Sequence, residues 1–99
     1  MQNSYYVYNF PEIRQTEDKR YFALLEQAKK IQEEANEVIG ARLKLATHKE
    51  TMELRENLLI ETLDTVQACE TMLRLFELPE ISHAKELVIE KNAERGYYV

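Results

Sequence analysis

An all-α fold is predicted for this chain, and three observations predict it. The 99 residues include only two glycines and two prolines, whereas 31% of them are charged. Apolar residues recur at three- and four-residue intervals along most of the chain, which is the period of an amphipathic helix. The length corresponds to one domain with a modest core, so we expect part of its apolar surface to need a partner subunit.

Residues 1–15 differ in composition from the rest and are expected to form an extended arm. Aromatic residues gather here before Pro11, and helix formers are few; the aromatic residues are Tyr5, Tyr6, Tyr8 and Phe10. We interpret the tyrosines as packing on the helices or on a neighbouring subunit. Residues 16–99 are expected to form a single helical domain.

The first helix is expected to run from about Glu17 to near Gly40 or a little beyond. Thr16 supplies a capping hydroxyl, and the acidic residues after it suit the positive end of the helix dipole. One glycine costs only about 1 kcal/mol inside a helix, so Gly40 does not have to end it. We expect a turn near Thr47 and His48.

A second helix is predicted from about Thr51 to Leu78, because Pro79 disfavours helical backbone in the residue before it. A third helix is predicted to begin at Pro79 and to stop at Gly96. The apolar stripe of the second helix includes Cys69, which is therefore expected to be a small core residue rather than a nucleophile.

Charge and cysteine content exclude several classes of function. The formal net charge is -5, so the chain lacks the basic patch that binding to duplex nucleic acid requires. One cysteine allows no internal disulfide and suits a reducing compartment. No apolar run reaches the roughly 20 residues of a membrane span, and no signal peptide or glycine-rich phosphate loop is seen. We expect a cytoplasmic protein that does not bind membranes.

Two pairs of acidic residues share a three-residue spacing: Glu34 with Glu37, and Glu61 with Asp64. Residues three apart lie on the same face of a helix. If the two helices are antiparallel, all four carboxylates can converge. Mg²⁺ prefers hard oxygen ligands and keeps water and substrate phosphates as its remaining ligands. The four residues are therefore candidate ligands for a divalent metal.

The position of these acids around their helices separates them from ordinary surface glutamates. Glu61 lies within the apolar stripe of its helix and Glu34 lies at the edge of its own, whereas Glu56 and Glu70 point away. Carboxylates that face a core are costly unless they are paired or bound to metal. The pattern leaves two interpretations open, a metal site and a buried polar network.

Two motifs resemble those of the MazG-like all-α nucleoside triphosphate pyrophosphohydrolases, over about residues 20–96. The first motif is a double glutamate, here Glu33 and Glu34, with a third glutamate, Glu37, three residues after the second. It is followed on the next helix by Glu-x-x-Asp, here Glu61 and Asp64. The other is the C-terminal segment Lys91-Asn92-Ala93-Glu94-Arg95-Gly96, which is similar to the tail that faces the nucleotide in this family.

The resemblance implies a bundle of antiparallel long helices plus a C-terminal helix, completed by assembly into a homodimer or homotetramer. It implies that Mg²⁺, with Mn²⁺ as an alternative, is bound by the four catalytic carboxylates Glu34, Glu37, Glu61 and Asp64. Glu33 would form a salt bridge or orient water. Lys91, Asn92 and Arg95 would contact phosphate or sugar; the alternative for these three is an ordinary charged helix C-terminus.

The reaction implied is hydrolysis of a nucleoside or deoxynucleoside triphosphate at the α-phosphorus, which yields the monophosphate and pyrophosphate. Mg²⁺ would neutralise the triphosphate and position the attacking water, while a carboxylate assists removal of the proton. The arm tyrosines could then stack on the nucleobase. The alternatives are a non-enzymatic helical interaction module with solvated acids and a phosphoribosyl-ATP pyrophosphohydrolase-like enzyme, whose pattern the tail fits less well.

Overall fold

The computed structural model describes residues 8–14 and 20–99, and within these ranges it consists of three α-helices without a strand. Helix α1 spans Arg20–Thr47, α2 spans Met52–Leu73 and α3 spans Leu78–Glu94. The all-α prediction is confirmed. The expected cap at Thr16, and Tyr5 and Tyr6 of the arm, lie outside the described residues.

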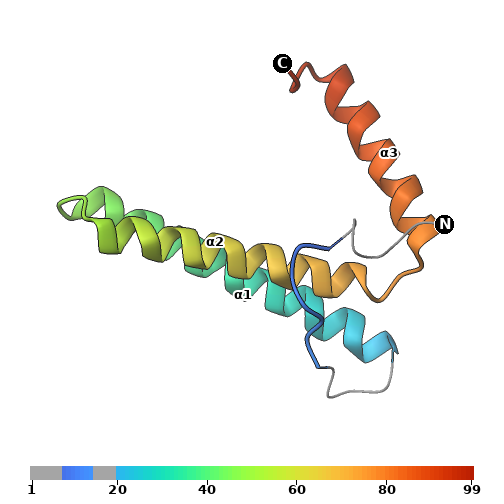
Figure 1. The fold of residues 1–99 in the computed structure, drawn as a ribbon, viewed down its shortest axis with the longest axis horizontal. Helices are drawn as coiled ribbons and strands as arrows, with labels where there is room; N and C mark the ends of the chain where they lie inside the picture. Colours follow the sequence, from blue (N-terminus) through green and yellow to red (C-terminus); the bar gives the residue numbers. More distant parts are fainter. Residues whose placement is uncertain (1–7, 15–19) are drawn as a thin grey trace.

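Helices α1 and α2 form an antiparallel hairpin, with the connection at residues 48–51 (Figure 1). The first helix continues through Gly40 and ends at Thr47, which confirms the expected turn. The next helix begins directly after Thr51, whose hydroxyl oxygen accepts the backbone N–H of Leu54 at 3.2 Å. This hydrogen bond satisfies one of the amide donors that a helix start leaves without a partner.

Helix α2 ends at Leu73 rather than continuing to Pro79, so the predicted end was wrong. Two three-residue backbone hydrogen bonds tighten the turn that follows it. Glu77 is already extended there and caps α3, and its amide donates to the Glu80 carboxylate at 2.9 Å in a capping box. Helix α2 ends early because the capping box of α3 requires extended backbone at Glu77, two residues before Pro79.

Helix α3 ends as expected at Gly96, which has a φ of 72°. The amide of Gly96 donates to the Ala93 carbonyl and that of Tyr97 donates to the Asn92 carbonyl, both at 3.0 Å. This pair of bonds is the Schellman arrangement, in which glycine adopts the left-handed backbone without steric cost. Figure 1 shows α3 leaning away from the hairpin, with its C-terminal end farthest from it.

The interface between α1 and α2 is built on small side chains. Ala23, Ala41 and Ala68 are the buried apolar residues of the described part of the chain, and none of the large side chains there is fully buried. Cys69 is exposed, contrary to the prediction. Ala68, Glu70 and Thr71 are the buried residues of that turn. Since residues are about 100° apart around a helix, these three occupy the other directions and Cys69 turns outward.

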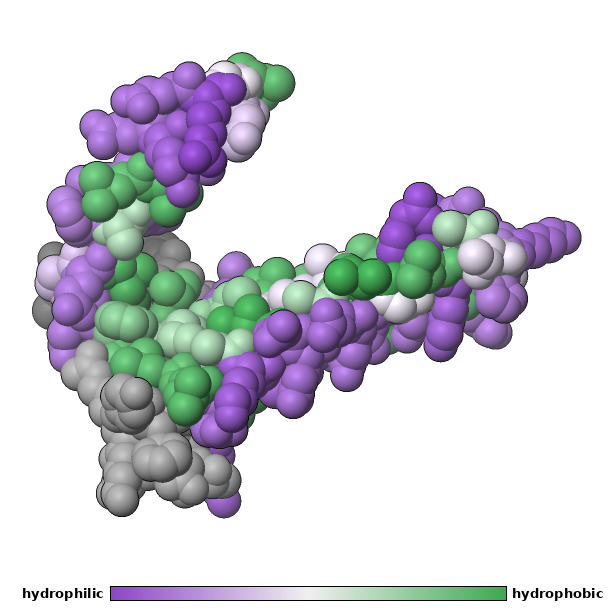
Figure 2. All heavy atoms as spheres, turned by 180° about the vertical axis from the view of Figure 1, so that it is seen from behind, coloured by the Kyte–Doolittle hydropathy of each residue, from purple (hydrophilic) through white to green (hydrophobic). Residues whose placement is uncertain are grey.

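Large apolar residues remain exposed on the hairpin and on α3. Figure 2 shows them running along the face of the hairpin on the side of α3. The radius of gyration is 16.3 Å, whereas a domain of this length has about 13 Å. No helix within the described ranges is both long enough and apolar enough to cross a bilayer. The exposed large apolar residues include Ile39, Leu43, Leu59, Ile60, Leu63, Leu73, Phe76, Leu87, Val88 and Ile89.

Candidate functional site

The hairpin brings three of the four predicted acids together. One carboxylate oxygen from each of Glu34, Glu61 and Asp64 lies within 4.8 Å of the others. Glu34 of α1 is buried, with 8% of its surface exposed. On α2, Glu61 is half-buried and Asp64 is exposed. These three residues, called the acidic cluster below, combine a buried, a half-buried and an exposed acidic residue.

Glu37, the fourth predicted acid, is exposed and lies one turn after Glu34 on α1. A side-chain hydrogen bond with Glu61, and next the negative charge of Glu34, raises the pKa of Glu37 to about 7. The hydrogen bond favours the protonated form of Glu37, and the neighbouring carboxylates disfavour a further negative charge. Glu37 is therefore electrostatically coupled to the acidic cluster, although its carboxylate is not one of the three that converge within 4.8 Å.

Two oxygens in the acidic cluster lack hydrogen-bond donors. Glu34 Oε2 and Glu61 Oε2 are buried and have no hydrogen-bond partner among the described residues. A buried acceptor without a partner costs about 1–3 kcal/mol, and more when it is charged. A cation bound between the helices would supply the missing partner, since carboxylate oxygens are the ligands that divalent Mg²⁺ prefers. The donor set thus fits a hard divalent metal ion.

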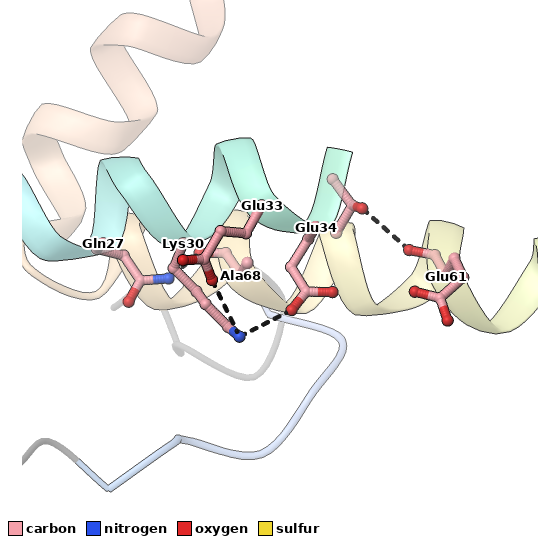
Figure 3. A network of polar contacts seen from close by, with 7 residues as sticks. Gln27, Lys30, Glu33, Glu34, Glu61 and Ala68 are labelled. Atoms are coloured by element: carbon pink, nitrogen blue, oxygen red, sulfur yellow. Dashed lines mark hydrogen bonds and ion pairs between the residues drawn. The ribbon is translucent and has the colours of Figure 1, made fainter. Parts of the chain in front are cut away.

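Lys30 is a site residue that the motif analysis missed. Its Nζ lies 3.0 Å from Glu34 Oε1 and 3.7 Å from Glu33 Oε2 (Figure 3). The hydrogen bond to Glu34, and then the charge of Glu34, raises the pKa of the lysine. Glu33 is exposed and forms its ion pair with Lys30 outside the acidic cluster. The four-residue spacing of Lys30 and Glu34 on one helix is the signal that could have found the pair.

A pocket of about 230 Å³ opens beside the acidic cluster. Glu34 and Asp64 form part of its lining, and Lys30 brings a cationic group. Gln27 of α1 donates through Nε2 to the Ala68 carbonyl of α2 at 2.8 Å, which joins the two helices at this level. The remaining lining residues are Ile13, Gln67 and Thr71. The pocket therefore combines anionic, cationic, amide, hydroxyl and apolar groups within one small volume.

Glu70 of α2 was expected to point away from the core, and this prediction was wrong, since the residue is buried with 4% exposed. The arm covers it: the amides of Asn9 and Phe10 donate to its two carboxylate oxygens, each at 2.8 Å. This contact joins residues about 60 positions apart in the chain. Of the arm tyrosines, Tyr8 packs under Arg74, with 4.2 Å between the guanidinium carbon and the ring centre.

The three residues predicted to contact the nucleotide lie on and just after α3. Lys91 and Arg95 are exposed and Asn92 is half-buried. Because α3 leans away from the hairpin (Figure 1), its C-terminal end does not meet the acidic cluster. The backbone carbonyls of Lys91 and Asn92 accept hydrogen bonds that end the helix. The fold of the chain thus brings three of the predicted acids together but does not bring Lys91, Asn92 and Arg95 to them.

Comparison with known proteins returned no match to this chain, whether among family models, curated proteins or solved structures.

Proposed function

We propose that the protein is a Mg²⁺-dependent nucleotide pyrophosphohydrolase of the MazG-like type, which cleaves nucleoside or deoxynucleoside triphosphates to monophosphates and pyrophosphate. The observation that carries the proposal is the convergence of three carboxylate oxygens within 4.8 Å. Two of these carboxylates have a buried oxygen without a donor among the described residues. The spacing of the acidic motif and its resemblance to the family supply the choice of reaction.

In the proposed site, Glu34, Glu61 and Asp64 would hold the metal and Glu37 would contribute a fourth carboxylate. When bound, Mg²⁺ or Mn²⁺ supplies charge neutralisation and lowers the pKa of a coordinated water. A bound cation would reduce the repulsion among the acids and would neutralise part of the negative charge of Glu34, which otherwise pairs with Lys30. Its ammonium group, exposed at the pocket, is then free to pair with a substrate phosphate.

The reaction is a displacement at the α-phosphorus. The water oxygen forms a bond to phosphorus while the bond to the α–β bridging oxygen breaks, and pyrophosphate leaves with that electron pair. The proton of the attacking water passes to a carboxylate of the cluster, which must be ionised to accept it. The products are the nucleoside monophosphate and pyrophosphate.

Assembly into a homodimer or homotetramer is part of the proposal. It is supported by the extended shape of one copy and by the apolar residues left exposed on the hairpin and α3. A second copy would cover this surface, and its α3 would offer Lys91, Asn92 and Arg95 to the acids. Size-exclusion chromatography with light scattering should give at least twice the 11.7 kDa of the chain. The proposed compartment is the cytoplasm, which suits an exposed free thiol.

The decisive experiment is a screen for Mg²⁺-dependent release of pyrophosphate from a panel of ribo- and deoxynucleoside triphosphates, with phosphoribosyl-ATP included. Glu61→Gln should abolish release because it removes a metal ligand without a large change of volume. Glu56→Gln is the matched control, since Glu56 is an exposed residue of α2 whose carboxylate is not in the acidic cluster. Equal release by wild type and Glu61→Gln on every nucleotide would rule out the proposed site.

A non-enzymatic helical interaction module is the second candidate, and the exposed apolar residues on the hairpin and α3 favour it. The two candidates differ in their response to ligand. A ligand at a hundred times its Kd stabilises a protein by about 2.7 kcal/mol, so Mg²⁺ with nucleotide should raise the Tm of an enzyme. An interaction module with solvated acids would show no such shift.

A further inference from the structure

Residues 8–14 form a non-helical strap across the hairpin, near the start of α1 and the end of α2 (Figure 1). Buried Glu70 holds it by three hydrogen bonds. The backbone amides of Asn9 and Phe10 each donate at 2.8 Å, and the side-chain amide of Asn9 donates at 3.0 Å. Hydrogen bonds to an ionised acceptor are about twice as strong as neutral ones, so this carboxylate is a firm attachment point.

Arg74 lies one helical turn after Glu70 and holds the same part of the strap. Its Nη2 donates to the Phe10 carbonyl at 2.7 Å. Its guanidinium group lies over the ring of Tyr8, 4.2 Å from the ring centre, which is a cation–π contact. Glu70 in the last turn of α2 and Arg74 directly after this helix therefore engage three consecutive residues of the strap through both backbone and ring.

The strap reaches the pocket beside the acidic cluster. Three residues after the attachment, Ile13 lines this pocket together with Glu34 and Asp64. Ile13 is the one large apolar side chain among the described lining residues, the others being polar or alanine. A ligand that fits this lining has anionic groups for a metal and Lys30, and an apolar surface for Ile13. A nucleotide has both, in its phosphates and in the faces of its base.

We propose that the strap is a wall of the substrate pocket, in which Ile13 is a specificity-determining residue against the nucleobase and Glu70 and Arg74 are positioning residues that hold the wall in place. The identity of the ligand rests on the proposed function, whereas the attachment of the strap does not. Through the strap, Glu70 and Arg74 would influence which substrate binds, although neither residue belongs to the acidic cluster.

The attachment is tested by hydrogen–deuterium exchange on the full chain. Glu70→Ala should speed exchange of the Asn9 and Phe10 amides by about tenfold or more, since local opening then exposes them. Glu70→Gln should retain part of the protection, because its amide oxygen still accepts a hydrogen bond. Glu56→Ala, an exposed position on the same helix, is the control and should leave both amides unchanged. Unchanged protection in Glu70→Ala would overturn the attachment.

The role of Ile13 is tested by steady-state kinetics on the nucleotide panel. Widening the pocket by Ile13→Ala and narrowing it by Ile13→Trp should change KM by about tenfold for some bases and not for others, the size expected when an apolar contact is altered. The kcat should stay within about twofold, because Ile13 is not part of the acidic cluster. Glu70→Ala should shift KM in the same base-dependent way, and Glu70→Gln should restore it in part.

The control on the same strap is Arg14→Ala, since Arg14 is exposed and does not line the pocket. If wild type hydrolyses nucleotides while the Ile13 variants keep its KM pattern, the pocket wall is wrong and the proposed function stands. If wild type hydrolyses none of the panel, the proposed function fails and Ile13 loses its role as a specificity residue. The exchange of the Asn9 and Phe10 amides then decides the attachment alone.

Discussion

Replacing Glu61 with glutamine is predicted to stabilise the metal-free protein and to abolish its stabilisation by Mg²⁺. In wild type, Glu61 Oε2 is buried without a hydrogen-bond donor among the described residues. The carboxylates of Glu34 and Asp64 lie close to it. Glutamine removes one negative charge from this group at nearly constant volume, and its amide can donate to the orphan oxygen of Glu34. Glu61→Gln should therefore lower the affinity for the metal and raise the free energy of unfolding of the metal-free protein.

The magnitude follows from the spacing of the charges. Two unit charges at the 4.8 Å limit of the cluster repel by about 0.9 kcal/mol in water and by about 3.5 kcal/mol at an effective dielectric constant of about 20. Glu61 is half-buried and Asp64 is exposed, so solvent screening favours the lower part of this range. We expect a gain of about 1–2 kcal/mol, which raises the Tm of a domain of this size by roughly 4–16 °C.

The assay is thermal unfolding at about pH 8, one unit above the Glu37 pKa of about 7, in EDTA and in saturating Mg²⁺ at one protein concentration. Wild type should gain stability from Mg²⁺, whereas Glu61→Gln should begin higher and gain little. Glu56→Gln, exposed on the same helix, should follow wild type in both buffers. A lower Tm for Glu61→Gln in EDTA, together with a wild-type response to Mg²⁺, would refute the reasoning.

Three further predictions concern single groups. Without metal, the free energy of unfolding should fall as pH rises from about 4.5 to about 7. The reason is that folding raises the pKa of Glu37 from 4.5 to about 7, so the folded state binds more protons than the unfolded state in this range. Glu37→Gln should flatten this part of the stability–pH profile, and an unchanged slope would contradict the assignment. Thr51→Ala removes the acceptor for the Leu54 amide and should cost about 1 kcal/mol, seen as a lower urea midpoint with an unchanged m-value. Gly96→Ala places a side chain at φ 72°, where a Cβ would have no neighbouring atom within 4 Å, so any effect comes from the backbone and not from a clash. The backbone cost of about 1–2 kcal/mol should fray the end of α3. Hydrogen exchange at the Tyr97 amide as slow as in wild type would count against this prediction.

Helix starts and stops were largely predictable because their signals are short-range. Thr51 caps α2 through a bond to an amide three residues away, and Gly96 ends α3 through bonds within the same turn. The end of α2 was predicted wrongly for a related reason. Pro79 was expected to end α2, but the capping box of Glu77 and Glu80 begins the next helix before it.

Part of the candidate site was also predictable. A three-residue spacing on each of two helices, joined by a short connection, is enough to bring Glu34, Glu61 and Asp64 within reach of one another. The acidic spacing does not indicate Lys30, which pairs with Glu34 at 3.0 Å across one helical turn. The four-residue spacing of these two residues does predict this ion pair.

By itself, the sequence determined the all-α class, the position of the first turn, the start of α2, the stop of α3 and the spacing that brings three of the acids together. These features depend on hydrogen bonds and periodicities within a few residues. Only the tertiary structure decided that Glu70 is buried beneath the arm, that Ile13 lines the pocket, and that α3 leans away from the acidic cluster. Such contacts join residues up to about 60 positions apart, and the arm has no repeating pattern that would show where it packs. Burial of Glu70 follows from where the arm lies, whereas helix periodicity reports only the face that Glu70 occupies.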